Sequence, residues 1–335
     1  MELREIGEFG LIVRIQKRLA ALPPAVIKGI GDDAAVTSLS PGTYLVSTVD
    51  LLVEGVHFNL SLTSAHLLGR KSLAVNLSDM AAMGAKPCFA LISLAIPAQT
   101  SVEFIDDFIS GFIEMAGAHC VSLIGGDTSA SPDKLFVNIT LLGEGKKGEL
   151  VFRSGAQPGD RLYVTGTLGD SLLGLHVAQK REGKPASPDE AYLLERHLNP
   201  TPRVREGRAL AEKGLARAMI DVSDGLFSDL THICEESRVG ATVLVERIPL
   251  SAPFQSVASP PGGQGWQAAI KGGEDYELLF SAAPEKEAEV RELARGWECG
   301  LACIGKIEPQ SQGIIIRDEN GPVDPRLLKG YDHFA

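Results

Sequence analysis

Short apolar runs alternate with longer amphipathic segments along most of the chain. The clearest helix is predicted at residues 64–84, where Leu73 and Leu77 share one side and Gly84 is suited to end the helix. A capping box that begins at Thr100 predicts a second helix. The other predicted helices lie at 8–22, in a segment that ends near 214, in a segment that begins near 225, and at 284–295. The predicted strands lie at 44–49, 89–95, 121–124, 135–142, 161–165, 218–220, 276–280, 301–307 and 313–317.

Strands and helices alternate in both halves of the chain, which is typical of an α/β or α+β protein. At 335 residues the chain is long enough for two domains of about 150 residues each. We therefore predict an α+β (mixed α/β) fold with domains at 1–150 and 151–335, joined near the segment 153–160. Residues 251–265 are rich in Ser, Pro and Gly and are predicted to form a mobile loop.

Composition and charge exclude several classes of protein. An apolar content of 44% with 22% charged residues is ordinary for a globular protein, and no apolar run is long enough to span a membrane. The formal net charge of −11 disfavours broad binding to nucleic acid. The start of the chain lacks the apolar core of a signal peptide, and five scattered cysteines without a Cys-x-x-Cys pair suit a reducing compartment. We expect a cytoplasmic protein with no nucleic-acid or membrane partner.

Four stretches couple glycine to carboxylates where a predicted strand meets a loop: 28–36, 125–128, 221–225 and 272–275. In the first stretch Asp32 and Asp33 are adjacent, and neighbouring carboxylates repel each other unless a cation is close. Mg²⁺ takes oxygen ligands and is usually held by one or two carboxylates plus substrate phosphates. We therefore hypothesise that these stretches, with Asp50 and Asp79, converge on Mg²⁺-bound phosphates.

Some of these carboxylates have two interpretations. Asp79 lies with Ser72 and Asn76 on one line of the predicted helix, near the C-terminal end, where the helix dipole disfavours an anion. This line is either a solvent-facing stripe or part of a metal site, and the surrounding Ala, Leu and Met residues favour the metal site. Asp221 and Asp224 either ligate one ion or cap the helix that follows them.

Glycine pairs allow two kinds of phosphate site. The pair at 125–126 follows a predicted strand and is suited to an anion-binding concavity of backbone N–H groups, with Asp127 as a metal ligand. Residues 29–34 match the relaxed dinucleotide-binding fingerprint, but the two carboxylates there would repel a bare pyrophosphate, so we reject that interpretation. His57 lies near a strand end, where a lone histidine is more often structural than in contact with a ligand.

In this order the motifs resemble those of the thiamine-monophosphate kinase family, which belongs to the superfamily typified by aminoimidazole ribonucleotide synthetase. The resemblance runs nearly end to end and rests on residues 8–9, 29–34, 50, 54–58, 76–84, 125–128, 153–156, 221–225, 273–278 and 330–334. It implies Mg²⁺-dependent transfer of the γ-phosphoryl group of ATP to thiamine monophosphate, the final step of thiamine diphosphate biosynthesis. It also implies a homodimer whose N-terminal sheets pair into a barrel, a C-terminal α/β sandwich, and an active cleft between the domains.

The resemblance also implies the roles of individual residues. Several Mg²⁺ ions would be held by Asp32, Thr48, Asp50, Asp79, Asp127, Asp221 and Asp224. ATP would contact Asp32, Gly126, Asp127, Arg153 and Ser223, and thiamine monophosphate would contact His57, Glu274 and Tyr331. Val49 departs from the family, in which many relatives have a hydroxyl residue, so only its backbone carbonyl could serve as a metal ligand. Asp50 and Asp127 are expected to be the most critical, and no residue is assigned as acid or base.

Two other interpretations remain open. A sibling enzyme, such as a selenophosphate or purine-pathway synthetase, would share the acidic stretches. The selenium enzymes carry a reactive cysteine near the N-terminus, whereas the first cysteine here is Cys88, and His57 and the tail at 330–334 also favour the thiamine branch. The alternative from another class is a non-catalytic metal- or nucleotide-binding protein. ATP consumption that depends on thiamine monophosphate would separate the three.

Overall fold

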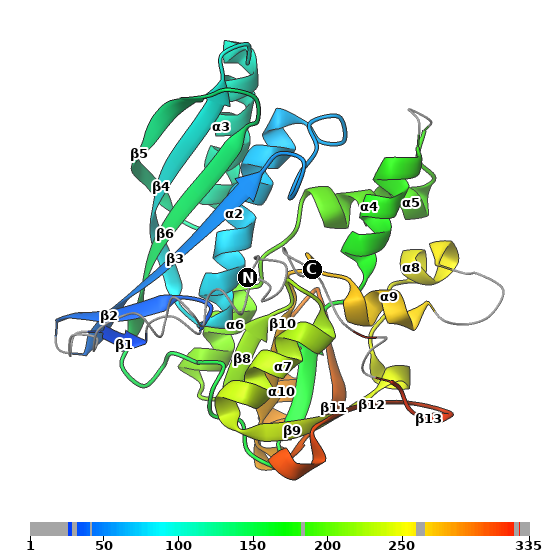
Figure 1. Ribbon diagram of the computed structural model, residues 1–335. Helices are drawn as coiled ribbons and strands as arrows, with labels where there is room; N and C mark the ends of the chain where they lie inside the picture. Colours follow the sequence, from blue (N-terminus) through cyan, green and yellow to red (C-terminus); the bar gives the residue numbers. More distant parts are fainter. Residues whose placement is uncertain are drawn as a thin grey trace, which may run out of the picture.

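The computed structural model describes residues 26–28, 32–40, 42–181, 185–258, 265–324 and 328. Within these residues the strands form a six-stranded sheet and a seven-stranded sheet, and helices pack against them (Figure 1). The architecture confirms the predicted mixture of α and β structure. The predicted helix at 8–22 and Tyr331 lie outside the described residues. The first sheet ends at Lys146 and the second begins at Arg161, and the domain boundary at 150/151 stays a prediction.

The first sheet has the strand order β1-β2-β3-β6-β4-β5, in which β4 and β5 run parallel and the other neighbours run antiparallel. Its strands are β1 (Val26–Lys28), β2 (Ala35–Ser40), β3 (Thr43–Val53), β4 (Lys86–Pro97), β5 (Ser122–Ser131) and β6 (Phe136–Lys146). In β6, Val137, Ile139 and Leu141 are buried and alternate with partly exposed residues. This period of two indicates that one face of the sheet is covered.

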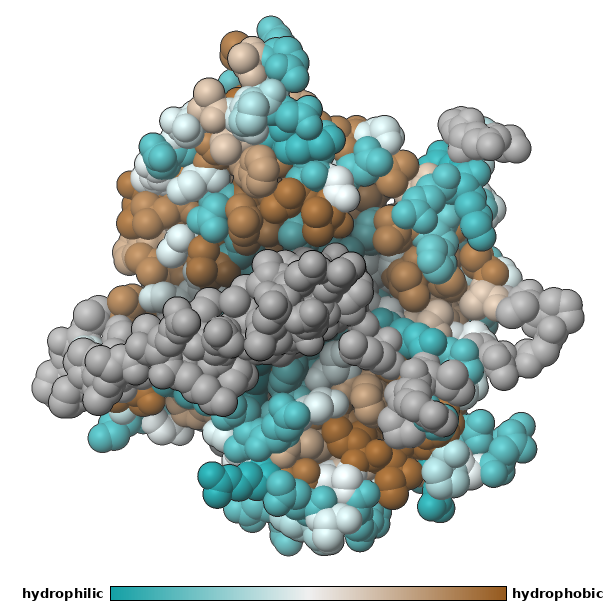
Figure 2. Space-filling view, in the orientation of Figure 1, coloured by the Kyte–Doolittle hydropathy of each residue, from teal (hydrophilic) through white to brown (hydrophobic). Residues whose placement is uncertain are grey.

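The other face of this sheet is open and carries apolar side chains. Val49 and Leu51 on β3 and Phe89 on β4 are exposed, and Val49 is 59% accessible to solvent. Figure 2 shows apolar residues gathered over this sheet on the face turned to the viewer. An exposed apolar sheet face of this kind marks a surface suited to contact with another molecule.

The central helix is α2 (Ala65–Ala82), which lies between the two sheets (Figure 1). Its first turn is capped by Ser64, whose side chain accepts a hydrogen bond from the backbone N–H of Leu67. Side chains on all sides of the helix are buried, including Ser72 and Asn76. The solvent-facing interpretation of this polar line is therefore wrong for both residues, because a helix buried all round belongs to a core.

The second sheet has the strand order β13-β12-β9-β11-β7-β10-β8. Its strands are β7 (Arg161–Thr165), β8 (Ala218–Asp221), β9 (Val239–Leu244), β10 (Leu278–Ala282), β11 (Leu301–Pro309), β12 (Ile314–Asp318) and β13 (Gly321–Pro322). The remaining described helices are α3 (Val102–Ala118), α4 (Asp170–Lys180), α5 (Pro188–Leu198), α6 (Val204–Glu212), α7 (Leu226–Ser237), α8 (Ala252–Val257), α9 (Trp266–Lys271) and α10 (Glu287–Ala294), with short 3-10 turns at η1 (Val245–Arg247), η2 (Pro284–Lys286) and η3 (Gln310–Gln312).

One apolar core joins the two sheets. It contains Leu77 and Met80 of α2 together with Met219 of β8 and Phe280 of β10, all fully buried. A second core lies entirely within the C-terminal half. Because α2 contributes to the shared core, the carboxylates that it carries are held in a fixed position relative to both sheets.

Three predicted local features are wrong. The helix α3 is capped by Ser101, which accepts from the backbone N–H of Phe104, one residue after the predicted cap at Thr100. Residues 125–128 do not form a loop, because β5 continues through them in a parallel ladder with β4. Residues 251–258 contain the short helix α8, which Ser251 caps, rather than belonging wholly to a loop.

None of the described helices is both long and apolar enough to cross a membrane.

Removal of a core side chain from α2 should destabilise both halves together. We expect Leu77→Ala to lower the free energy of unfolding by about 2–5 kcal/mol, because it leaves a cavity in the shared core. Thermal or urea denaturation should show one shifted transition. The control is Ile113→Ala on α3, where the side chain is 56% exposed and the expected change is below about 0.5 kcal/mol. Two separate transitions, with one unshifted, would contradict the shared core.

Candidate active site

An acidic cluster lies where the two sheets meet. Asp33 follows β1, Asp79 lies near the C-terminal end of α2, and Asp221 is the last residue of β8. One carboxylate oxygen of each lies within 4.8 Å of the other two. Asp50 on β3 is close enough for its charge to affect Asp79 and Asp221. The structure thus brings together the first and third of the glycine–carboxylate stretches with Asp50 and Asp79.

The cluster destabilises the folded protein when all its carboxylates are ionised. Burial, followed by repulsion from Asp33, raises the pKa of Asp50 to about 6 and that of Asp221 to about 8. Burial, followed by repulsion from Asp50 and Asp221, raises the pKa of Asp79 well above its usual value. Each shift means that the folded protein favours the protonated form. A cation among these groups would remove the repulsion.

The donor set fits a hard divalent cation such as Mg²⁺. The hydroxyl of Thr48 donates a hydrogen bond to Asp79, and the hydroxyl of Ser78 donates to Asp221 at 2.6 Å. The Oδ2 atoms of Asp33 and Asp50 are buried and have no hydrogen-bond partner among the described residues. Unpaired buried oxygens require an explanation, and carboxylate and hydroxyl oxygens are the ligands that Mg²⁺ prefers.

Two cationic side chains lie beside the cluster. Arg153 forms an ion pair with Asp33, and its backbone N–H donates to Asp32 at 3.4 Å. The ammonium of Lys28 lies 3.2 Å from Asp32. Asp32 therefore faces these cations, although burial still raises its pKa to about 6. Asp33, and not Asp32, is the residue whose carboxylate lies close to those of Asp79 and Asp221.

Two loops of the C-terminal half lie against each other next to the cluster. The backbone N–H of Glu274 donates to the carbonyl of Ser223 at 2.8 Å, and that of Tyr276 donates to Val222 at 2.9 Å. Gly273 permits this approach, because a Cβ there would lie 2.3 Å from the carbonyl oxygen of Ser223. Glu274 and Tyr276 both have positive φ angles, 62° and 52°. Such strained conformations occur mainly at functional sites.

The helix α7 is not capped by the residues that sequence suggested. The backbone N–H groups just before the helix are instead bound by Asp229, whose Oδ2 accepts from Ser223, Asp224 and Gly225 at 3.1–3.2 Å. The capping interpretation is therefore wrong for Asp221, which stays free to join the acidic cluster. Asp229 fixes the loop that follows Asp221.

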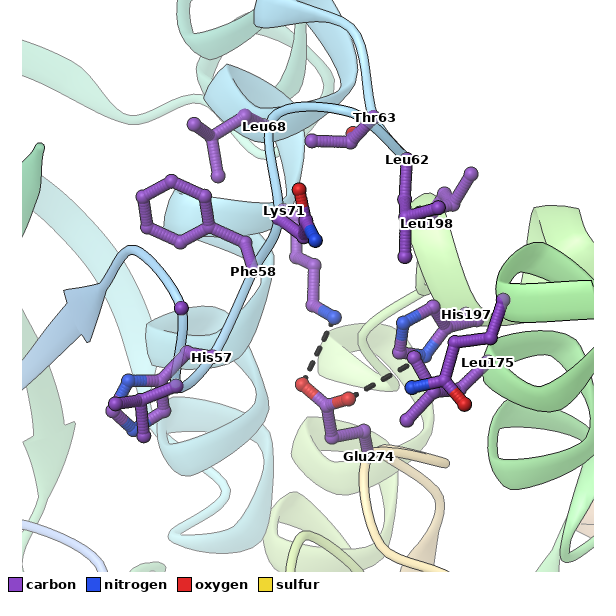
Figure 3. Close-up of a pocket in the computed structure, with 14 residues that line it drawn as sticks. His57, Phe58, Leu62, Thr63, Leu68, Lys71, Leu175, His197, Leu198 and Glu274 are labelled. Atoms are coloured by element: carbon purple, nitrogen blue, oxygen red, sulfur yellow. Dashed lines mark ion pairs between the residues drawn. The ribbon is translucent and has the colours of Figure 1, made fainter. Parts of the chain in front are cut away.

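A cavity of about 230 Å³ lies beside α2 and the loop of Glu274 (Figure 3). The ammonium of Lys71 lies 2.9 Å from one carboxylate oxygen of Glu274, and Nδ1 of His197 lies 3.4 Å from the other. Burial acts to raise the pKa of Glu274, but the ammonium and hydrogen bond of Lys71, together with the charges of His197 and His57, lower it overall. Burial lowers the pKa of His197 to about 4, so this imidazole is neutral at pH 7. The other labelled lining residues are His57, Phe58, Leu62, Thr63, Leu68, Leu175 and Leu198.

His57 is both anchored and part of the cavity wall. Its Nδ1 accepts a hydrogen bond from the backbone N–H of Val53 at 3.0 Å, which places the proton on Nε2 in the neutral ring. The ring lies on the opposite side of the cavity from His197 (Figure 3). The structural and ligand-contact interpretations of His57 are thus compatible.

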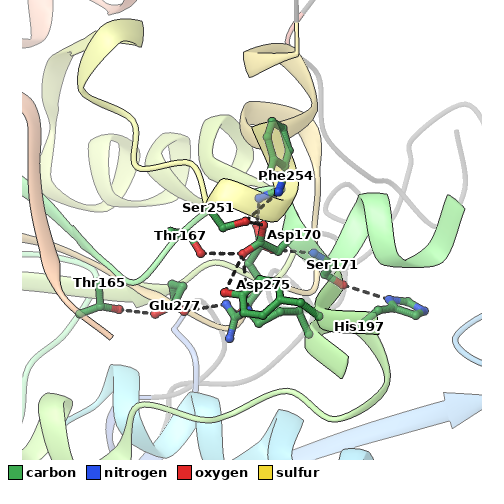
Figure 4. A network of polar contacts seen from close by, with 12 residues as sticks. Thr165, Thr167, Asp170, Ser171, His197, Ser251, Phe254, Asp275 and Glu277 are labelled. Atoms are coloured by element: carbon green, nitrogen blue, oxygen red, sulfur yellow. Dashed lines mark hydrogen bonds and ion pairs between the residues drawn. The ribbon is translucent and has the colours of Figure 1, made fainter. Parts of the chain in front are cut away.

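A polar network holds the wall of the cavity from behind (Figure 4). Asp275 accepts from the backbone N–H groups of Gly169 at 2.6 Å and Ser171 at 3.1 Å, which fixes the start of α4. The hydroxyl of Ser171 lies 3.0 Å from Nδ1 of His197. The orientation of His197 therefore depends on the residue that follows Glu274.

The residues expected from sequence are distributed as follows. Asp32, Thr48, Asp50, Asp79, Asp221 and Arg153 lie in or beside the acidic cluster; His57 and Glu274 line the cavity; Ser223 and Asp224 lie on the loop between β8 and α7; Gly126 and Asp127 lie on β5; Tyr331 lies outside the described residues. Sequence reasoning did not assign Asp33, Lys71 or His197 to the site. The signal for Asp33 was its place in the first acidic stretch, and for Lys71 it was a basic residue in a largely apolar helix.

Asp127 does not reach the acidic cluster of its own chain. The strand register places Asp127 of β5 in one row with Ser93 of β4, Asn138 of β6 and Leu51 of β3. Asp127 therefore lies three strands away from Leu51, the residue that follows Asp50. At about 4.8 Å per strand this is roughly 14 Å. Side chains in one such row point to the same face, and the row of Leu51 is the open face, opposite that of Asp50.

Comparison with known proteins places this geometry in a family context. Residues 31–144 match the N-terminal domain of AIR synthase related protein, and residues 157–318 match its C-terminal domain. The chain is 39% identical over 331 residues to thiamine-monophosphate kinase of Escherichia coli (strain K12), with 98% of each chain covered. It is 36% identical over 330 residues to thiamine-monophosphate kinase of Bacillus subtilis (strain 168), covering 98% of this chain and 100% of the relative. The solved structure of AaThiL complexed with AMPPCP and TMP matches with a TM-score of 0.86 and 35% identity, covering 99% of both chains.

The acidic cluster predicts a stability that depends on pH and on divalent cations. Since the pKa values of Asp32, Asp50 and Asp221 are raised from 3.8 to about 6, 6 and 8, their protonated forms favour folding. Stability of the metal-free protein should therefore fall as pH rises from about 4 to about 8. Mg²⁺ should raise the free energy of unfolding by on the order of a few kcal/mol, since each pKa unit corresponds to about 1.4 kcal/mol. The increase should be largest near pH 8.

Thermal unfolding in EDTA and in Mg²⁺, across this pH range, measures the effect. Sodium chloride at the same ionic strength is the control, because screening alone should act weakly on buried groups. A melting temperature that is insensitive to Mg²⁺ at every pH would contradict the cation site.

Proposed function

The chain belongs to the thiamine-monophosphate kinase family, and we propose that it transfers the γ-phosphoryl group of ATP to thiamine monophosphate, giving thiamine diphosphate and ADP. The observation that carries this proposal is the position of an all-oxygen acidic cluster near a cavity, both built on α2. Lys71 of the cavity and Asp79 of the cluster are about two helical turns apart, roughly 12 Å along the axis. A substrate with a phosphate at one end and an organic group at the other matches this spacing.

The reaction joins two anions, so its main obstacle is repulsion. An oxygen of the acceptor phosphate attacks the γ-phosphorus of ATP, a new P–O bond forms, and the bond to the β-phosphate oxygen breaks as ADP leaves. A phosphate monoester has a second pKa near 6, so the acceptor is already largely deprotonated at pH 7 and needs no general base. Catalysis in phosphoryl transfer is mainly positioning and electrostatic stabilisation. We infer direct in-line transfer with no phosphoenzyme.

Asp33, Asp79 and Asp221, with Asp50 and Thr48 beside them, are the residues that would hold Mg²⁺. Bound Mg²⁺ would supply positive charge that screens the phosphates from each other and from the carboxylates. The protein's own part is to hold these oxygens in place, through the core around α2.

Arg153 and the loop of Ser223 are suited to orient ATP. Arg153 lies at the edge of the cluster with its guanidinium on Asp33, so it can offer hydrogen-bond donors to a phosphate. Ser223 is fixed between Asp229, which binds its backbone N–H, and Glu274, which binds its carbonyl. Ser223 thus connects the nucleotide position to the cavity wall.

A homodimer is part of this proposal. The open sheet face carries Val49, Leu51 and Phe89, which are apolar and exposed in the single chain. The edge strand β5 carries Asp127 in the row of Leu51, on this open face. Pairing of two such faces would cover the apolar residues and bring Asp127 towards the acidic cluster of the second chain. A cytoplasmic location is supported by the five cysteines, all described and none in a disulfide.

The central test is ATP turnover that requires thiamine monophosphate and Mg²⁺. The wild type should form ADP and thiamine diphosphate, whereas Asp50→Asn should lose about a hundred- to a thousandfold in kcat/KM, the scale seen when electrostatic stabilisation of a transition state is removed. Circular dichroism and melting temperature should remain those of a folded protein. ADP formation that is independent of thiamine monophosphate, or a variant close to wild type, would overturn the proposal.

A mixing experiment tests whether Asp127 acts across the dimer. Asp50→Asn and Asp127→Asn should each be inactive alone, but exchange of their subunits should create one intact site in each mixed dimer. Activity should then return to about a quarter of wild type for a symmetric dimer that pairs at random. If the mixture stays inactive although exchange is shown by mass spectrometry, Asp127 serves its own chain instead.

A further inference from the structure

Lys71 is an unusual residue for the interior of an apolar helix. It lies on α2 and is only 4% exposed, and its ammonium ends 2.9 Å from Glu274 at the cavity wall. Its surroundings include the apolar side chains of Phe58, Leu68 and Leu198 (Figure 3). Burial of an ion pair costs desolvation energy that attraction often only balances, so such a pair is weak support for stability by itself.

A second buried ion pair shows what a purely structural arrangement looks like in this chain. Glu277 has a side chain with no exposure, and it is enclosed by Arg196 at 2.7 Å, Arg203 at 2.5 Å and the hydroxyl of Thr165 at 2.8 Å. Glu274, in contrast, keeps 29% of its side chain exposed and faces the cavity together with Lys71. The Lys71–Glu274 pair is therefore accessible to a ligand, whereas the Glu277 network is not.

The charges around Glu274 balance, which limits what the cavity can recognise. Lys71 on α2 is cationic, His197 on α5 is neutral at pH 7, and His57 is the third titratable group that acts on Glu274. Burial raises the pKa of the Tyr276 phenol, and Glu274 lies close enough to raise it further. With one ammonium and one carboxylate, the cavity has no excess negative charge for a cationic ring. It instead presents a hydrogen-bond donor and an acceptor side by side. This pattern favours a ligand whose own acceptor and donor are adjacent and in the matching order.

The distance to the acidic cluster indicates which part of the substrate lies here. With the acceptor phosphate at Asp79, roughly 12 Å along α2 leads to Lys71, beyond the ethyl group and the thiazolium ring. The ring at the far end of thiamine monophosphate is an aminopyrimidine. One edge of that ring has an amino group that donates and an adjacent ring nitrogen that accepts.

We propose that Lys71 and Glu274 together read this edge: the carboxylate of Glu274 accepts from the amino group, and the ammonium of Lys71 donates to the adjacent ring nitrogen. Lys71 is in this account a specificity-determining residue that also orients Glu274. His197, held by Ser171, keeps the second oxygen of Glu274 in place. The inference rests on the proposed function, because it takes thiamine monophosphate as the substrate.

The wild type alone provides the first test. Oxythiamine monophosphate carries a carbonyl oxygen in place of the amino group and a proton on the adjacent ring nitrogen, so its donor and acceptor are exchanged. The phosphate end fixes the order of the two groups along the cavity wall. We expect kcat/KM for this analogue to be about 10- to 100-fold lower than for thiamine monophosphate, because charged hydrogen bonds are lost. Equal kcat/KM for the two substrates would overturn the inference.

The second test uses Lys71→Met, which keeps the length of the side chain and removes the charge. We expect KM for thiamine monophosphate to rise about 10- to 100-fold while KM for ATP is unchanged, with most of the preference over the oxo analogue lost. Since Lys71 lowers the pKa of Glu274, KM in this variant should also increase as pH falls towards 5. Glu274→Gln should likewise reduce the preference, because an amide can both donate and accept.

Lys86→Met is the matched control, since Lys86 forms an exposed pair with Glu144 at 3.0 Å on the surface. It should leave every kinetic constant unchanged. If Lys71→Met lowers only the melting temperature and keeps the KM and preference of the wild type, Lys71 is a structural residue and the inference fails. Failure of the proposed function is distinguishable, because the wild type itself would then not consume ATP with thiamine monophosphate. If Lys71→Met does not fold, the comparison of the two substrates in the wild type still decides the question.

Discussion

The structure depends on keeping several buried carboxylates close together. Asp33, Asp79 and Asp221 approach within 4.8 Å of one another, and Asp50 adds a fourth negative charge. In a folded chain without a cation this arrangement is unfavourable, as the raised pKa values of Asp50 and Asp221 show. Proteins retain such unfavourable groups mainly at functional sites. The repulsion that destabilises the protein is also what gives it affinity for a divalent cation.

The rest of the fold maintains this constraint. The helix α2 is buried on all sides between two sheets, so Asp79 cannot move away from Asp221 without disturbing the shared core. The same helix carries Lys71 into the cavity and so relates the phosphate position to the organic end of the substrate. The loops that contain Ser223 and Glu274 are bound to each other through their backbones. The acidic cluster and the cavity wall are therefore parts of one rigid arrangement.

Much of this could be predicted from sequence because it depends on local patterns. Alternating strands and helices indicated the fold class. Carboxylates paired with glycine indicated Asp221 as part of the site, and the anion near the C-terminal end of an apolar helix indicated Asp79. Features that depend on pairing between distant strands could not be read in this way. The stretch at 125–128 has loop-like glycines, yet the ladder with β4 keeps it extended. Asp33, and not its neighbour Asp32, comes close to Asp79 and Asp221, and no local pattern reveals which of two adjacent carboxylates does so.

The most direct test of the account is to locate the cations themselves. Crystals grown with Mn²⁺ in place of Mg²⁺, with a non-hydrolysable ATP analogue, would give anomalous difference peaks at each bound ion. We expect a peak coordinated by Asp33, Asp79 and Asp221, in contact with phosphate oxygens. Peaks found only elsewhere, with these three carboxylates bound to protein groups or water alone, would contradict it.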